Sequence, residues 1–122
     1  MLQEPIREVL LRRGAFEVRR EMPIRYLADD QRVVRGTIDR LVWWIDAQGE
    51  ATHAEVQDFK TDTPGNSTLQ ADELERWIES RRQHHAEQLE HYRSAAAAWL
   101  GLPVGAVKAV LLFTSVGRVV HW

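Results

Sequence analysis

The stretch RVVRGTIDRLVWWI, residues 32–45, is rich in β-branched and aromatic side chains and predicts one long strand. A turn is expected at 46–49, where Asp46 and Gly49 stand close together. The next stretch, THAEVQDF (52–59), alternates through Ala54, Val56 and Asp58 and predicts a strand that pairs with the first as a hairpin. The remaining elements must be arranged around this hairpin.

Outward from the hairpin, apolar spacing and turn residues predict the other elements. They are a helix over 4–13, a strand over 16–27, a loop over 62–67, a helix over 72–100 with a break possible at 81–84, and strands over 107–113 and 118–122. The order helix, three strands, helix, two strands predicts an α/β fold in which helices flank a mixed sheet. The long helix then makes the crossover between the hairpin and the last two strands.

Composition narrows the class of protein. The 122 residues suit one domain, 1–122, and the absence of cysteine excludes disulfides, zinc-thiolate sites and iron-sulfur clusters. No run approaches the length of a membrane span and the charged amino terminus is unlike a signal peptide, so a cytoplasmic protein without a membrane partner is expected. Because the net charge is −2, any affinity for DNA must come from local patches or a tethered partner.

Three ionisable residues fall where the hairpin strands can bring them together. Asp58 and Lys60 alternate onto one face of their strand, and the paired strand can present Asp39 beside them. Since two close carboxylates repel each other, a bound Mg²⁺ or Mn²⁺ would explain the pair, and the backbone carbonyl of Phe59 is a further candidate ligand. The pattern predicts metal-assisted phosphodiester hydrolysis with Lys60 orienting water or balancing charge; exposed salt-bridge partners are the alternative.

Several motifs in this order resemble a known family. They are Glu21-Met22-Pro23, GTIDRLV (36–42), DFKTD (58–62), QLEHY (88–92) and LLFTSVGRVV (111–120). Together they resemble the RecB-type nuclease domain of the PD-(D/E)XK superfamily, and especially the carboxy-terminal end of AddA-type helicase-nuclease subunits. The resemblance covers almost the whole chain and implies a restriction-endonuclease-like fold.

The resemblance assigns roles to individual residues. It implies that Asp39 and Asp58 bind the metal and that Lys60 is the catalytic lysine. Gln88 and Tyr92, four residues apart on one helical face, match the family positions beside the active site, although Tyr92 also belongs to the apolar stripe of the helix. Glu21 matches a family position of unclear chemistry, and an exposed strand residue is the alternative.

The implied activity is Mg²⁺-dependent cleavage of DNA. Single strands or duplex ends would be delivered by attached helicase motor domains with a partner subunit, during double-strand-break repair. The chain would then be a carboxy-terminal fragment of a larger helicase-nuclease. Two alternatives stay open: an inactive nuclease fold that binds DNA ends or scaffolds a complex, and a stand-alone nuclease acting on another nucleic acid.

The sequence departs from the family pattern at one point. Related domains carry a metal-site histidine on a helix before the first strand, whereas no histidine precedes His53 here. Either the family helix is missing from this sequence or the site is incomplete. Glu4 or Glu8 is a candidate substitute, with a solvated helix charge as the alternative for both. The histidines of the long helix are expected to face solvent, with His84 able to face the cleft. A phosphate-contacting patch is predicted, with a solvated helix surface as the alternative, at these positions: Arg12, Arg13, Arg19, Arg20, Arg81, Arg82, His84 and His85.

Overall fold

The computed structural model describes residues 4–6, 15–27, 29–65 and 68–122. Its elements are β1 (Phe16–Leu27), β2 (Val33–Ile45), β3 (Ala51–Lys60), α2 (Ala71–Leu100), the 3-10 turn η1 (Val104–Ala106), β4 (Val107–Phe113) and β5 (Arg118–His121). The strands form one mixed sheet in the order β1-β2-β3-β4-β5, antiparallel except for the parallel pair β3–β4. The predicted α/β class, mixed sheet and hairpin are confirmed, and each strand matches its expected range within a residue.

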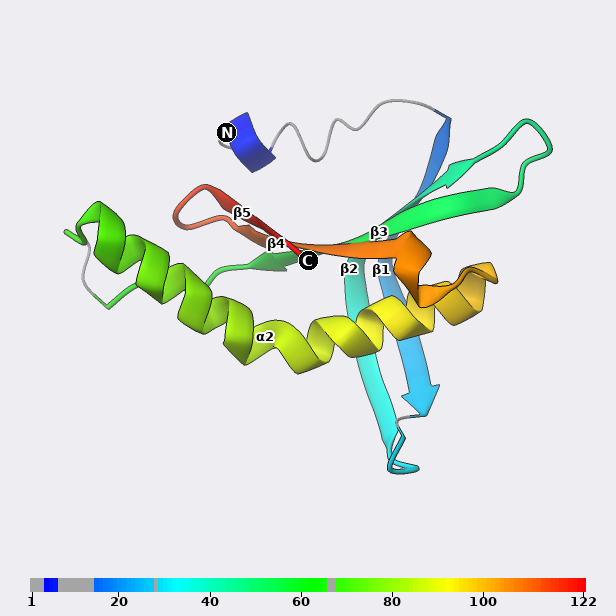
Figure 1. Cartoon of the computed structure of the whole chain (residues 1–122), viewed down its shortest axis with the longest axis horizontal. Coiled ribbons are helices and arrows are strands. Elements are labelled where there is room, and N and C mark those ends of the chain that lie inside the picture. The colour runs from blue at the N-terminus through cyan, green and yellow to red at the C-terminus, as the bar shows by residue number, and fades with distance from the viewer. Residues whose placement is uncertain (1–3, 7–14, 28, 66–67) are drawn as a thin grey trace.

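The core lies between α2 and one face of the sheet (Figure 1). Ala54 and Val56 of β3 and Ala109 and Leu111 of β4 are buried against this helix. Because α2 connects two parallel neighbours, it must cross the sheet before β4 can pair with β3. On the opposite face, Ile6 packs against β4 at Val110 and Leu112.

The long helix begins and ends at recognisable caps. Gln70 is the N-cap and Glu73 completes a capping box with it, while Gly101 adopts the left-handed conformation at the carboxyl end. The break considered at 81–84 is absent, since α2 runs continuously from Ala71 to Leu100. This segment holds neither glycine nor proline, so nothing in it interrupts the backbone hydrogen bonds.

The expected amino-terminal helix is only partly within the described residues. Residues 4–6 are helical, and residues 7–13 of the predicted range lie outside the description. The short turn η1 before β4 was not expected from the sequence. Among the described residues, no helix combines the length and apolar character needed to cross a bilayer.

Candidate active site

Asp39 and Asp58 meet where the pairing of β2 with β3 stops. The last backbone pair of this ladder is Arg40 with Gln57, and the next position in register would set Asp39 opposite Asp58. There Asp39 Oδ2 accepts a hydrogen bond from Phe59 N at 2.8 Å. The Asp39 side chain therefore takes a backbone donor of β3 and stands beside the end of that strand.

Asp58 is a buried carboxylate in an unusual setting. It is 4% exposed, and no donor in the described part of the chain directs a hydrogen bond at its Oδ2, although Lys60 Nζ lies 2.9 Å from this atom. Burial, followed by hydrogen bonding with Asp39, raises the pKa of Asp58 to about 6, against the opposing effect of Lys60. The site therefore holds its second carboxylate at a cost that a cation would relieve.

Lys60 is held by contacts from two other elements. Its ammonium donates to Gln88 Oε1 on α2 at 2.9 Å, so it lies between Gln88 and Asp58. Its backbone carbonyl accepts hydrogen bonds from Thr114 N at 3.1 Å and Thr114 Oγ1 at 3.3 Å. The structure thus brings together four residues predicted for the site, with the ammonium fixed in direction.

Tyr92, one turn after Gln88, is buried beneath the same region. Burial, together with the charges of Asp58 and Asp39, raises the pKa of its phenol, which keeps it protonated at neutral pH. Its ring passes so close to Gly36 that a Cβ at this position would lie 2.8 Å from Tyr92 Oη. Gly36 in the GTIDRLV motif is therefore a position where the close approach of Tyr92 leaves no room for a side chain.

Gln88 and Tyr92 also line an open cleft of about 280 Å³. Its other lining residues are Arg32, Val34, Arg35, Glu87 and His91. His84, which was predicted to be able to face the cleft, is not among these lining residues, whereas His91 is. The cleft combines basic side chains with the two helix residues that the sequence assigned to the site.

A cluster behind Lys60 was missed by the sequence reasoning. His85 Nε2 lies 3.0 Å from Asp62 Oδ2, and Arg81 Nη1 lies 3.5 Å from the same oxygen. His85 is only 12% exposed in its side chain, so the expectation that it faces solvent is wrong. Burial lowers the pKa of His85 despite the Asp62 carboxylate, so the ring is neutral at pH 7 and donates to Asp62. Asp62, an acidic residue only two positions after Lys60, was the one feature of the sequence that could have indicated this cluster.

The predicted arginine patch is largely engaged within the protein. Arg82 lies over the Trp122 ring at 4.5 Å and Arg19 lies over Trp99 at 5.3 Å. Arg20 differs, because it lines a hollow of about 200 Å³ with Asp39, Arg40 and Phe59. Arg12, Arg13 and Glu8 lie outside the described residues. Among the described residues of the predicted patch, Arg19, Arg81 and Arg82 therefore make contacts within the protein, and their contact with phosphate stays a prediction.

The acidic candidates within the described residues do not complete a larger metal site. Glu21 is exposed and has a positive φ of 49°, and Glu4 is exposed in the helical residues 4–6. Within the described ranges no group of three or more His, Asp or Glu side chains could hold a metal ion. Asp39 and Asp58 alone fit Mg²⁺, which uses one or two carboxylates and keeps several waters. The enclosed, donor-poor Oδ2 of Asp58 supports this fit.

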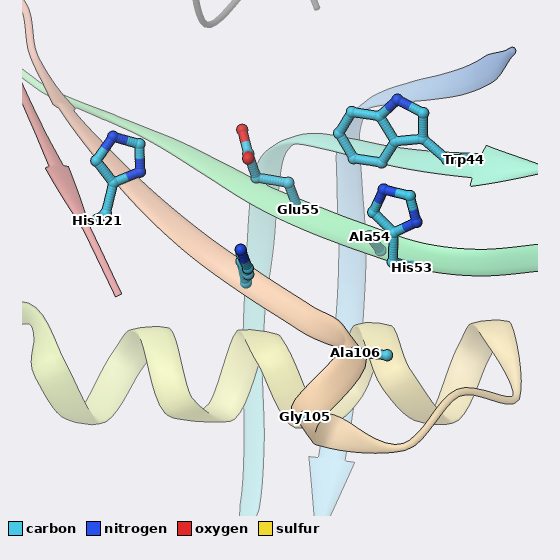
Figure 2. A pocket seen from close by; sticks show the side chains of 8 residues that line it. Trp44, His53, Ala54, Glu55, Gly105, Ala106 and His121 are labelled. Atoms are coloured by element: carbon cyan, nitrogen blue, oxygen red, sulfur yellow. The ribbon is translucent and has the colours of Figure 1, made fainter. Parts of the chain in front are cut away.

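A second hollow, of about 540 Å³, lies at the other end of β3 (Figure 2). Trp44 and His53 stack there with ring centroids 4.5 Å apart, and Glu55 and Lys108 are neighbours in the β3–β4 register. Gln57 Nε2 donates to Glu55 Oε1 at 2.8 Å, so this carboxylate has a donor. The hollow is larger than the cleft beside Gln88, but it lacks a pair of converging carboxylates.

Comparison with known proteins adds no relative. No protein-family model matches the chain, and no curated protein matches it.

Proposed function

We propose that this chain is a metal-dependent deoxyribonuclease domain of the PD-(D/E)XK kind, with a restriction-endonuclease-like fold. One observation carries the proposal: Asp58 Oδ2 is buried without a directed donor, beside Asp39 and 2.9 Å from the Lys60 ammonium. A purely structural ion pair would gain from donors at every buried oxygen. A carboxylate poised to hold a cation explains the arrangement better.

Asp39 and Asp58 would hold Mg²⁺ or Mn²⁺, with the Phe59 carbonyl as a further candidate ligand. When bound, the metal supplies Lewis-acid polarisation of the phosphodiester and activation of water. Lys60, kept in direction by Gln88, balances the negative charge that develops on the phosphate. Tyr92 lies buried beside the site and packs its ring closely against Gly36 of β2. These roles together give phosphodiester hydrolysis.

The wider setting follows from the family resemblance. In it, single strands or duplex ends of DNA reach the site from attached helicase motor domains with a partner subunit. The chain is then the carboxy-terminal nuclease domain of a cytoplasmic helicase-nuclease in DNA double-strand-break repair. The net charge of −2 supports tethered delivery, because a linked domain gains effective concentration from its motor and needs little affinity of its own.

A second candidate function is favoured by the small number of acidic groups. Only two carboxylates converge in the described part of the chain, and no histidine precedes His53. A nuclease fold that binds DNA ends or scaffolds a repair complex without cleaving would also have these features. It differs from the first candidate in needing no bound metal.

The test is cleavage of a labelled single-stranded DNA with Mg²⁺ or Mn²⁺, alongside Mn²⁺ binding measured by calorimetry. We expect Asp58→Ala to lose both cleavage and metal binding. Lys60→Ala should lose cleavage by at least about 100-fold while it keeps the metal. Arg76→Gln, an exposed helix residue in a weak pair with Asp72, is the matched control and should behave as the wild type.

The same measurements are made on a longer chain that extends the amino terminus, since the family places a metal-site residue there. DNA binding without cleavage by this longer, Mn²⁺-loaded protein would exclude the enzyme and leave the scaffold. Cleavage that survives in both Asp58→Ala and Lys60→Ala would place the activity elsewhere.

A further inference from the structure

The hollow of about 540 Å³ beside Trp44 is lined from four strands that lie side by side. Their contributions are Trp44 from β2, His53 and Glu55 from β3, Lys108 from β4 and His121 from β5. Their chain neighbours Ala54, Val107 and Val120 belong to or pack against the core beneath α2, so strand alternation directs the lining side chains to the opposite face of the sheet. The hollow therefore lies on the face of the sheet away from α2 and from the cleft beside Gln88.

An aromatic pair forms one side of the hollow. The rings of Trp44 and His53 are parallel within 2° and their centroids are 4.5 Å apart. His53 is exposed and Trp44 is half-buried, so the pair presents ring surface to solvent. Phe16 lies next to Trp44, with its ring centroid 6.3 Å away, and supports the indole from β1. Such a surface favours a planar ligand, since a base of any kind can stack on aromatic rings.

The Glu55 carboxylate is a fixed acceptor beside this aromatic surface. Glu55 is 6% exposed but lines the hollow, and Figure 2 shows it between the aromatic pair and His121. Gln57 Nε2 donates to Glu55 Oε1 at 2.8 Å, and Arg40 Nη1 donates to Gln57 Oε1 at 2.6 Å, so three buried side chains hold one another in place. A carboxylate has room for about four donors. Glu55 can therefore take a donor from a ligand in addition to its contacts within the protein.

The side of the hollow across from the aromatic pair is basic. Lys108 is exposed and pairs in register with Glu55, and His121 follows on β5. Lys108 is one of only two lysines in the chain, the other being Lys60 at the candidate active site. An ammonium suits a phosphate as a compact point charge, and an imidazole N–H is a further donor. Because neighbouring strands are roughly 4.8 Å apart, the row from Trp44 to His121 extends roughly 14 Å.

The row thus requires a planar group, a hydrogen-bond donor and an anion at successive positions of one ligand. A nucleotide whose base has an exocyclic amine combines all three, because the amine of adenine or cytosine donates to a carboxylate. We propose that the hollow binds such a nucleotide, with the base against Trp44 and His53, the amine donating to Glu55, and the phosphate at Lys108 and His121. This site is separate from the candidate active site and does not depend on the proposed nuclease function.

The experiment measures the binding of three ligands to the wild type by calorimetry in EDTA. Deoxyadenosine monophosphate (dAMP) has the amine and the phosphate, deoxyinosine monophosphate (dIMP) has a carbonyl in place of the amine, and deoxyadenosine lacks the phosphate. We expect dAMP to bind at least about 10-fold more tightly than dIMP, because a carbonyl facing a carboxylate leaves two acceptors without a donor. It should bind about 5-fold more tightly than deoxyadenosine. Equal affinities for the three ligands, or no measurable binding of dAMP, would overturn the proposal.

Two variants assign the contacts. Glu55→Gln keeps an acceptor for Gln57 and should reduce the preference for dAMP over dIMP to about 2-fold or less. Lys108→Gln should lower the affinity for dAMP by about 5-fold and leave that for deoxyadenosine unchanged. Arg76→Gln removes a charge from the exposed surface of α2 and is the matched control, which should bind all three ligands as the wild type does. A full preference retained in Glu55→Gln, or unchanged dAMP binding in Lys108→Gln, would overturn the proposal.

A free mononucleotide and the end of a nucleic-acid strand present the same base and phosphate. A 5′-phosphorylated oligodeoxyadenylate, measured against dAMP in EDTA, distinguishes these two sources. Tighter binding of dAMP supports a free nucleotide, and tighter binding of the oligomer supports a strand end. In either case the ligand that binds more tightly should lose affinity in Lys108→Gln, and an oligomer whose binding ignores both variants would overturn the proposal.

Discussion

Each half of β3 contains a buried carboxylate, but the two carboxylates differ in their hydrogen-bond donors. At the carboxylate end, Asp58 is buried beside Asp39 and has no directed donor at Oδ2. At the aromatic end, where Trp44 and His53 stack, Glu55 is equally buried but accepts from Gln57 and pairs in register with Lys108. The aromatic end has the larger hollow. The comparison teaches that the two ends differ in how a buried carboxylate is satisfied, by an ion pair without a directed hydrogen bond at one end and by an amide donor at the other, and that the size of the hollow does not follow this difference.

The largest expected effect is a difference between Asp58 and Glu55 in how the free energy of unfolding depends on pH. The pKa of Asp58 is about 6 in the folded chain and 3.8 as its ordinary value, so the folded state binds more protons between these values and loses stability as pH rises through this window. In EDTA, the free energy of unfolding of the wild type should fall by up to about 3 kcal/mol between pH 4 and pH 8 because of this group. Asp58→Asn should not show this fall. Urea denaturation across pH 4–8 measures it.

The matched variant at the aromatic end is Glu55→Gln, which keeps an acceptor for Gln57. It should retain the pH dependence of the wild type between pH 4 and 6. If Glu55→Gln flattened this dependence while Asp58→Asn did not, the roles of the two ends would be reversed.

A smaller effect on stability is expected from substitution of two glycines, Gly36 beside Tyr92 and Gly105 at the aromatic end of β3. Gly36→Ala would place a Cβ 2.8 Å from Tyr92 Oη, and the buried ring cannot move freely, so we expect a loss of about 1–3 kcal/mol in the free energy of unfolding. Gly105 lines the hollow of the aromatic end and has no atom within 4 Å of the position of a Cβ. Gly105→Ala should change stability by about 0.5 kcal/mol or less. Thermal unfolding of both variants tests the contrast, and equal losses would contradict it.

The smallest effect compares two histidines. His85→Asn removes the donor that holds Asp62 behind Lys60, so loss of about 1 kcal/mol should lower kcat/KM for DNA by about 5-fold without changing DNA affinity. His53→Asn disturbs the stack with Trp44 and the contact of His53 Nδ1 with Thr52 Oγ1, and it should leave kcat/KM unchanged. A fall of the same size in both variants would show that the two ends of β3 are not independent.

The sequence was sufficient for the elements and for the central residues of the site. Strand alternation in 52–59 and the apolar run in 32–45 place Asp39 and Asp58 on neighbouring strands, and helical spacing places Gln88 with Tyr92. These are local periodicities, which a single chain displays directly. The convergence of Asp39, Asp58 and Lys60 followed from them, while their catalytic roles stay a prediction.

Features that depend on distant partners were not accessible in this way. His85 was expected to face solvent because the residues next to it are polar, yet Asp62, 23 positions earlier, buries one side of it. Arg82 and Arg19 each lie over the ring of a tryptophan far along the chain, a contact that no local spacing predicts. That Arg20 lies opposite Arg40 and Arg25 opposite Arg35 emerges only when the register of β1 and β2 is known, because no spacing within either strand reveals it.

The contact of Thr114 with the Lys60 carbonyl also indicates at which stage of folding the candidate site forms. Both carboxylates belong to the first half of the chain, but β3 gains its second neighbour only after α2 and β4 are in place. Pairing between segments so far apart forms slowly, because loop closure precedes the stabilising contacts. A ribosome-bound chain that ends before residue 107 would have both carboxylates of the candidate site but neither the strand that pairs with β3 nor Thr114, which binds the Lys60 carbonyl. We therefore expect any cleaving activity to appear only after the last strands are made.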